Sequence, residues 1–286
     1  MSIIKIEGIE KKYGKKTALQ GVSTEFATGR IYGLLGRNGA GKSTLINIIS
    51  NRVTANAGKV TLDGKQIKEN DKLLGKIYAM SEAVTMPTGL KFAQAMKITK
   101  DFYPDFDMKY AQTLADKFGL DVKKRLASLS TGYLTISKII LALSSCAEFI
   151  FLDEPILGLD ANHRELFYAL MVERFSETDC CMVVSTHLID ECANLFEHVV
   201  IIDEGKIIAD DEAESFLNDG YSVTGSAKLV DLYCEDKEII AQNTIGTIKS
   251  AYIKGNCGNI PKGLEVSKPT LQQVFINLTG GQEGTK

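Results

Sequence analysis

The chain alternates between short apolar runs and longer stretches in which apolar residues recur every three or four positions. Short apolar runs bounded by turn-forming residues are typical of buried strands, whereas the longer spacing is typical of amphipathic helices. The two patterns alternate through about residue 210, which predicts an α/β fold. Hairpin turns are expected at "LDGK" (62–65) and "DEGK" (203–206). The expected strands are residues 3–7, 22–26, 30–35, 59–62, 76–80, 149–152, 181–185 and 199–203.

The pattern changes twice along the chain. Between residues 86 and about 130 it becomes purely helical, as in "DMKYAQTLADKFGL" (107–120), which predicts a helical insertion in a domain of residues 1–213. After residue 213, short strand patterns, one helix and a final helix at "TLQQVFINLTG" (270–280) predict a small α+β accessory domain over residues 214–286. The acidic run "DDEAE" (210–214) is expected to open a helix, because acidic side chains complement a helix N-terminus.

Composition narrows the class of protein. The net charge of −3 gives no general attraction to nucleic acid. Residues 1–14 carry lysines and glutamates where an export signal needs an apolar run, so we expect no such signal. The most apolar stretch, residues 135–152, contains Lys138 and Glu148, and we expect no membrane span. The six cysteines form no CxxC motif, which predicts reduced, mostly buried thiols in a cytosolic protein.

The stretch "GLLGRNGAGKST" (33–44) contains the phosphate-loop pattern between an apolar strand and a helical run. Glycines let backbone N–H groups surround a phosphate at the positive end of the following helix. Lys42 is expected to reach the β- and γ-phosphates, and the Ser43 hydroxyl to coordinate Mg²⁺. The alternative is a glycine-rich turn without a ligand. The predicted nucleotide-binding residues of this loop are Gly36, Asn38, Gly39, Gly41, Lys42, Ser43 and Thr44.

Two later strands end in residues suited to the same chemistry. "FIFLDEP" (149–155) ends in Asp153, a predicted Mg²⁺ ligand, and Glu154, a predicted general base for an attacking water. "VVSTHLIDE" (183–191) ends in His187, which is placed to hydrogen-bond a γ-phosphate at the edge where parallel strands bind ligands. A lone histidine is usually structural, so this alternative stays open.

The stretch "SLSTGYLTISKII" (128–140) has two interpretations. Ser128 or Ser130 could cap the helix that follows, because a hydroxyl satisfies a free N–H at a helix N-terminus. Alternatively, Ser130 and Gly132 bind phosphate.

Taken together, these motifs resemble the ATP-binding subunit of an ABC transporter, over about residues 1–213. They are the phosphate loop, "LSTG" (129–132), "FIFLDEP", "LGLD" (157–160) and His187. The resemblance implies the P-loop ABC fold with an antiparallel β subdomain, and a head-to-tail dimer with two ATP molecules at its interface. It also implies that Ser130 and Gly132 contact the partner's ATP, and that Asp160 makes a contact across the dimer. Tyr13 in "KKYG" would stack on adenine, with a solvent-edge tyrosine as the alternative.

Two positions depart from the family pattern. The signature LSGGQ reads "LSTGY" here, with Thr131 and Tyr133 in place of a glycine and the glutamine. The family glutamine that links Mg²⁺ and attacking water to the membrane partner is replaced by Ser81, followed by Glu82. Serine is shorter than glutamine, so hydrolysis is predicted to be slow or differently coupled, unless Glu82 takes the role.

The C-terminal helix resembles that of ATPases paired with ABC-2-type exporter permeases. The stretches "DFYPDFD" (101–107) and "LSTGYLTISKIILALS" (129–144) resemble Gram-positive bacterial ATPases of small-molecule and peptide exporters, such as antibiotic-resistance systems and the exporter of phenol-soluble modulin peptides. The resemblance implies a cytoplasmic, Mg-ATP-hydrolysing subunit, peripheral on the inner face of the membrane. Its partners would be a separate permease and a second copy or related ATPase subunit, with no nucleic acid. The permease would dock near Ser81 to Tyr103, against apolar residues Met86, Phe92, Met96, Phe102 and Tyr103.

Two other functions remain open. One is a nucleotide-binding regulatory subunit with little turnover, which the two departures favour. The other is a soluble ABC ATPase without a transport role. Such proteins usually carry long coiled coils or two cassettes, whereas this chain has one phosphate loop and no heptad run.

Overall fold

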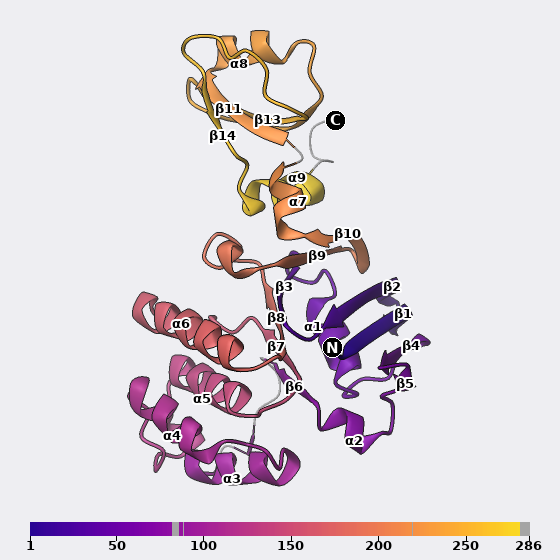
Figure 1. The fold of residues 1–286 in the computed structure, drawn as a ribbon, viewed down its shortest axis with the longest axis vertical. Helices are drawn as coiled ribbons and strands as arrows, with labels where there is room; N and C mark the ends of the chain where they lie inside the picture. The colour runs from indigo at the N-terminus through magenta and orange to yellow at the C-terminus, as the bar shows by residue number, and fades with distance from the viewer. Residues whose placement is uncertain (82–85, 88, 219, 281–286) are drawn as a thin grey trace. The chain divides into compact units, whose positions relative to one another are not determined.

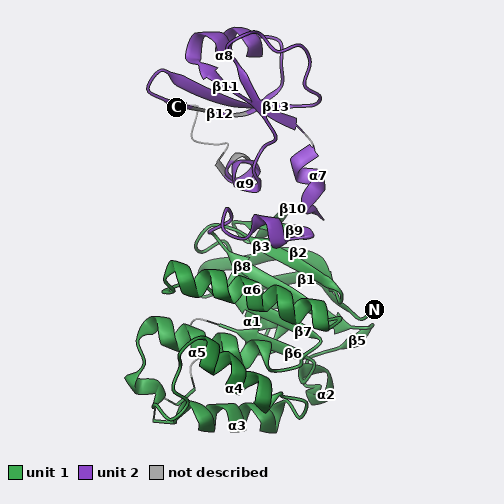
Figure 2. Cartoon of the chain, turned by 60° about the vertical axis from the view of Figure 1, so that its left-hand side comes forward, with its two compact units in different colours: residues 1–187, 200–210 green, residues 188–199, 211–286 purple. Residues whose placement is uncertain are grey.

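A computed structural model describes residues 1–81, 86–87, 89–218 and 220–280. The chain divides into two compact units (Figure 2). The first comprises residues 1–187 and 200–210, and the second comprises residues 188–199 and 211–286. The domain boundary at residue 213 stays a prediction.

The first unit is organised around a six-stranded sheet in the order β10-β9-β3-β8-β7-β6. Strands β3, β8, β7 and β6 are parallel neighbours, so their carboxyl ends meet at one edge of the sheet. These strands are almost entirely buried, as expected for a parallel sheet covered on both faces. The strands are β3 (Arg30–Leu35), β6 (Ile77–Met80), β7 (Phe149–Asp153), β8 (Cys181–Thr186), β9 (His198–Asp203) and β10 (Lys206–Glu212).

A second, antiparallel sheet has the order β2-β1-β4-β5. It is formed by β1 (Ile3–Tyr13), β2 (Lys16–Ala27), β4 (Ala57–Leu62) and β5 (Lys65–Gln66). Strands β1 and β2 are longer than the apolar runs suggested, because they continue as an exposed, lysine-rich hairpin beyond the core. The main hydrophobic core packs this sheet and α1 (Lys42–Ile49) against one face of the large sheet (Figure 1). Within this core the ring of Phe26 meets that of Phe151 edge-on, with centroids 5.5 Å apart.

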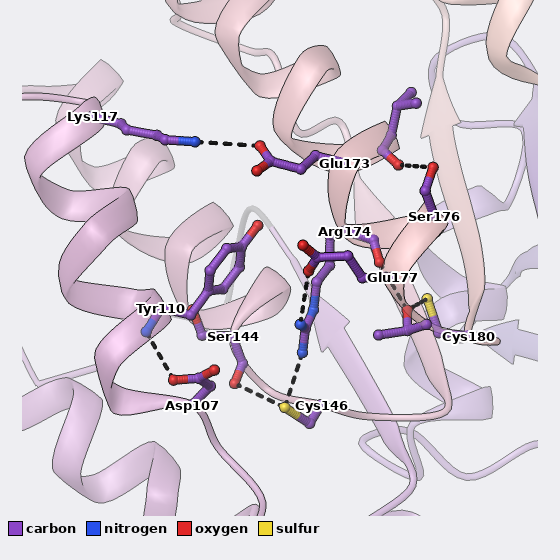
Figure 3. Close-up of polar contacts among 12 residues, drawn as sticks. Asp107, Tyr110, Lys117, Ser144, Cys146, Glu173, Arg174, Ser176, Glu177 and Cys180 are labelled. Carbon is purple, nitrogen blue, oxygen red and sulfur yellow. Dashed lines mark hydrogen bonds and ion pairs between the residues drawn. The ribbon is translucent and has the colours of Figure 1, made fainter.

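Helices cover the other face of the large sheet (Figure 1). These helices are α5 (Thr131–Leu143) and α6 (Ala161–Glu177). Helices α3 (Phe92–Phe102) and α4 (Met108–Lys117) pack on α5, farther from the sheet. A short α2 (Asp71–Leu74) and a 3-10 turn at Leu126–Ser128 lie elsewhere in the unit. The helical insertion is tied to α6 by Arg174, whose guanidinium lies 5.0 Å from the Tyr110 ring centroid and 3.0 Å from the Cys146 sulfur (Figure 3). Lys117 adds an ion pair of 3.3 Å to Glu173.

The prediction that residues 210–214 open a helix is wrong for most of the run. Strand β10 continues to Glu212, and the helix that follows, α7 (Ala213–Asn218), begins at Ala213. Asp210 accepts a hydrogen bond of 2.7 Å from the Thr24 hydroxyl, so this carboxylate joins β10 to β2 instead of facing a helix N-terminus.

The second unit contains a four-stranded antiparallel sheet in the order β12-β13-β11-β14. Its strands are β11 (Gly220–Ser226), β12 (Ile239–Ile245), β13 (Ile248–Lys254) and β14 (Glu265–Ser267). Helix α8 (Ala227–Cys234) packs on this sheet, where the Tyr221 and Tyr233 hydroxyls share a hydrogen bond of 3.0 Å. The unit also holds α9 (Leu271–Gly280) and a 3-10 turn at Ala193–Leu195.

All six cysteines are free thiols, and four of them are buried. The burial agrees with the expectation of mostly buried thiols, and their reduced state stays a prediction. Within the described residues, no helix combines the length and the hydrophobicity that a membrane span requires.

Candidate active site

The phosphate loop lies between β3 and α1, at the carboxyl edge of the parallel strands. Gly39 and Gly41 have φ angles of 84° and 118°, which side chains rarely tolerate. A Cβ atom at Gly36 would lie 2.5 Å from the Ile202 carbonyl oxygen. The loop therefore requires its glycines for backbone geometry. Lys42, only 5% exposed, folds back into the loop and donates a hydrogen bond of 2.7 Å to the Gly36 carbonyl.

The loop opens onto a pocket of about 300 Å³. The first helical residues of α1 and the Lys42 ammonium give its floor a positive potential, which suits phosphate. Lys16, which sequence reasoning did not single out, also lines the pocket and adds a further cation. The described lining residues are Tyr13, Lys16, Ala18, Asn38, Gly39, Gly41, Lys42, Ser43, Thr44 and Glu154.

Asp153 ends β7 beneath this pocket and is 3% exposed. Burial raises the pKa of its carboxyl, and hydrogen bonds from the Ser43 and Ser185 hydroxyls oppose that shift. The bond from Ser185 is 2.9 Å long. Asp153 and Ser43 thus bring a carboxylate and a hydroxyl together at the phosphate loop, and both are hard oxygen donors of the kind that Mg²⁺ prefers.

Glu154 follows directly and has a backbone φ of 47°, which is uncommon for a residue with a side chain. The backbone N–H of Glu154 donates a hydrogen bond of 2.9 Å to the Ser185 carbonyl, and this bond holds the backbone conformation. Its carboxylate lies 3.4 Å from the Lys42 ammonium and 3.0 Å from Nδ1 of His187. The structure therefore joins Lys42, Glu154 and His187 in one polar chain, with Glu154 reaching the pocket.

The Tyr13 ring stands at the rim of the pocket and is 48% exposed. The Lys11 ammonium lies 5.0 Å from the ring centroid and donates a bond of 2.7 Å to the Thr54 carbonyl. A cation over an aromatic face is attractive. Lys11 was not identified from the sequence, because its contact with Thr54 joins residues far apart in the chain.

Ser130, Gly132 and Asp160 form a separate cluster, and none of them is among the described residues that line the pocket. Ser130 caps α5 by accepting a bond of 3.3 Å from the Tyr133 N–H. Asp160 caps α6 by accepting a bond of 2.9 Å from the His163 N–H, which lowers the pKa of that carboxyl. The capping interpretation of Ser130 therefore holds within this chain, and phosphate binding by Ser130 stays a prediction.

The loops of this cluster pack closely on each other. A Cβ atom at Gly132 would lie 2.7 Å from the Gly158 carbonyl oxygen, and the Thr135 hydroxyl donates a bond of 3.1 Å to the Leu157 carbonyl. The ring of Tyr133, which replaces the family glutamine, lies 6.0 Å from the His163 ring. The start of α5 and the "LGLD" loop are thus one packed element.

Ser81 is 4% exposed and lines a groove bounded by α3, β6 and α5. Of the apolar residues predicted to contact a partner here, Met86, Phe102 and Tyr103 line this groove, whereas Phe92 and Met96 are buried core residues of the insertion. Glu82 lies outside the described residues.

Comparison with known proteins gives consistent matches. A family model described as "ABC transporter" matches residues 19–157. The lantibiotic transport ATP-binding protein SrtF of Streptococcus pyogenes is 30% identical over 219 residues, covering 76% of this chain and 93% of SrtF. The linearmycin resistance ATP-binding protein LnrL of Bacillus subtilis (strain 168) is 27% identical over 307 residues, covering 97% and 98%.

Among solved structures, one described as the ATP binding subunit of an ABC transporter superposes with a TM-score of 0.68 at 20% sequence identity. The match covers 75% of this chain and 91% of the other, and at this identity it establishes the fold.

Proposed function

Because the chain belongs to the family of ABC transporter ATP-binding proteins, we propose that it powers the export of a peptide or small molecule through a separate membrane permease. As a member of this family it is an ATPase subunit of a transporter. The export role is supported by relatives named for lantibiotic transport, linearmycin resistance and bacitracin transport. The observation that carries the proposal is the pocket in which the phosphate loop, Lys42 and Glu154 meet.

The chemistry that this pocket supports is attack of water on a γ-phosphate. Lys42 binds phosphate oxygens, and the loop N–H groups orient them. Glu154 accepts the proton of the attacking water at its carboxylate, and His187 holds that carboxylate through Nδ1. Phosphate entering the pocket would replace Glu154 as the partner of Lys42. This exchange would free the carboxylate at the moment when a base is needed.

The residues present fit Mg²⁺. Ser43 and Asp153 offer two hard oxygen donors beside the pocket, and Mg²⁺ is usually held by one or two side chains together with substrate phosphates and water. When bound, the ion supplies positive charge to the phosphate oxygens. Asp153 keeps the Ser43 hydroxyl oriented toward it through their hydrogen bond.

The cluster of Ser130, Gly132 and Asp160 supports a head-to-tail dimer with a second copy or a related ATPase subunit. Ser130 and Gly132 lie at the N-terminus of a thirteen-residue helix, where a hydroxyl and free N–H groups suit the γ-phosphate of the partner's ATP. Asp160 would contribute a contact across the same interface. The permease would dock in the groove beside Ser81, and the subunit would then lie on the cytoplasmic face of the membrane.

A second function, a low-turnover regulatory subunit, is favoured by Ser81, whose side chain is short and buried where the family has glutamine. The test is the ATPase rate of the chain with and without its permease in lipid vesicles, using Lys42→Ala as the inactive control. Stimulation by the permease, together with ATP-dependent substrate movement, supports export. Nucleotide binding without turnover in either condition would favour the regulatory function and contradict the ATPase assignment.

A further inference from the structure

The hairpin of β1 and β2 brings a cation to the nucleotide pocket that the phosphate loop does not supply. Its turn consists of Gly14 and Lys15, and Tyr13 pairs directly with Lys16 across it. Residues that face each other in an antiparallel pair project from the same face, with Cβ atoms about 4.5–5.5 Å apart. Both side chains line the pocket. Lys16 therefore stands beside the aromatic rim of the site.

Strand β2 runs from Lys16 to the phosphate loop. Ala18, two residues farther along the strand, also lines the pocket. Its carbonyl oxygen lies 2.8 Å from the position that a Cβ atom on Gly41 would occupy, so β2 touches the loop where α1 begins. Lys16 lies between this contact and Tyr13. Its flexible four-carbon stem can carry the ammonium over the space between the loop and the ring.

The other end of the pocket is marked by Lys42 and Glu154, whose ammonium and carboxylate are 3.4 Å apart. The proposed function assigns the γ-phosphate and the attacking water to this end. In a nucleotide the α-phosphate separates the β- and γ-phosphates from the ribose and the base. With the γ-phosphate at Glu154 and the base at Tyr13, the phosphate closest to Lys16 is the α-phosphate.

The Lys16 side chain is available to such a ligand. Among the residues that the structure describes, no carboxylate forms an ion pair with it, and Glu154, the acidic residue among the described lining residues, pairs with Lys42. The nearby Lys11 differs, because its ammonium donates a hydrogen bond to the Thr54 carbonyl. An ammonium is a compact point charge that binds phosphate oxygens well.

We propose that Lys16 binds the α-phosphate of the nucleotide and raises the affinity of this chain for ATP and ADP by the same factor. The inference rests on ATP binding in this pocket and does not depend on the export role. In hydrolysis, water adds its oxygen to the γ-phosphorus and ADP leaves with the oxygen that bridged the β- and γ-phosphates. The α-phosphate keeps its charge throughout. A contact of equal strength in the ground and transition states lowers KM without raising kcat.

The experiment compares the full chain with Lys16→Gln, Lys16→Arg and the control Lys15→Gln. Lys15 is an exposed lysine in the same hairpin and is not among the described residues that line the pocket. Affinities for Mg-ATP, ADP and pyrophosphate are measured by competition with a fluorescent ATP analogue, at low and high salt. Melting temperatures confirm that each variant is folded.

We expect Lys16→Gln to weaken ATP and ADP binding equally, by about 3–10-fold, and to reduce the salt dependence of both. Pyrophosphate, whose two phosphates are held by the loop and Lys42, should bind as it does to the parent. KM for ATP should rise by the same factor as the dissociation constant, with kcat within twofold of the parent value. Lys16→Arg should keep most of the affinity, and Lys15→Gln should behave like the parent.

Other results overturn the inference. A larger loss for ATP than for ADP would place Lys16 at the γ-phosphate, and a loss that disappears with 2′,3′-dideoxy-ATP would place it at the ribose. An equal loss for pyrophosphate, or for the Lys15→Gln control, would reduce its role to a general positive potential. Unchanged ATP affinity in Lys16→Gln would remove it from the site. In each of these cases the proposed function stands, whereas a parent chain that binds no ATP would overturn both.

Discussion

Replacing Glu154 by glutamine tests the catalytic chain most directly. The amide has the same shape and can still contact His187, but it cannot take a proton from water. Glu154 is the only carboxylate among the described residues that line the pocket, because Asp153 lies beneath it with its carboxylate bonded to Ser43 and Ser185. No other carboxylate among the described lining residues can therefore substitute. The turnover number should fall by about 10²–10⁴-fold, the range of general-base catalysis, which is about 2.7–5.5 kcal/mol in activation free energy.

The same change should leave ATP affinity unchanged or higher. Glu154 is the ion-pair partner of Lys42 at 3.4 Å, so removing its charge frees the ammonium for phosphate. Phosphate release gives the rate, a fluorescent ATP analogue gives the affinity, and size-exclusion chromatography with excess Mg-ATP should show a stable dimer. Glu148→Gln, before the start of β7, is the matched control and should behave like the parent. If the turnover number of Glu154→Gln is within threefold of that of the parent, the assignment of Glu154 as the general base is refuted. If this variant stays monomeric in excess Mg-ATP, the prediction of an ATP-bound dimer is contradicted for the isolated chain.

Four further changes test other parts of the site. Lys42→Ala removes the main phosphate contact, and an unchanged ATP affinity by calorimetry would contradict the phosphate-loop assignment. Lys11→Ala should weaken ATP binding about 2–5-fold, as expected for a cation over an exposed ring, but leave inorganic triphosphate binding unchanged; an equal loss for both ligands would argue against a role in positioning Tyr13. Ser81→Gln should raise basal ATPase activity with little change in ATP affinity, whereas damage by Glu82→Ala alone would assign the metal-linked role to Glu82. Gly132→Ala should lower the melting temperature of the isolated chain by an amount equivalent to about 1–3 kcal/mol, and an unchanged melting temperature would contradict the close contact with Gly158.

The sequence predicted those features that depend on neighbouring residues. The phosphate loop, the strand ending in Asp153 and Glu154, and the α/β order all follow from short motifs and local periodicity, and the family and fold they indicated are confirmed. The roles assigned to the site residues from these motifs stay predictions, although the structure places Lys42 and His187 in contact with Glu154.

Features that depend on distant partners were missed or misread. Arg52 meets Ala79, and Lys11 meets Thr54, through contacts that no local pattern encodes. The acidic run at residues 210–214 was misread because Asp210 bonds to Thr24, which is remote in the chain. The role of Phe92 could not be separated from that of Phe102 before the fold showed which side chain was buried.

The close approach of Gly132 to Gly158 affects how gene duplicates of this subunit should be interpreted. A copy that had lost the ability to hydrolyse ATP would still need Gly132, because any side chain there collides with the carbonyl of Gly158. Gly158 itself is fixed by a φ of 82°. If a paralogue retains both glycines, this indicates that folding has been selected for. It does not indicate whether the paralogue hydrolyses ATP. Loss of Glu154 is the better sign of a degenerate site, since no packing contact of this kind protects its carboxylate from drift.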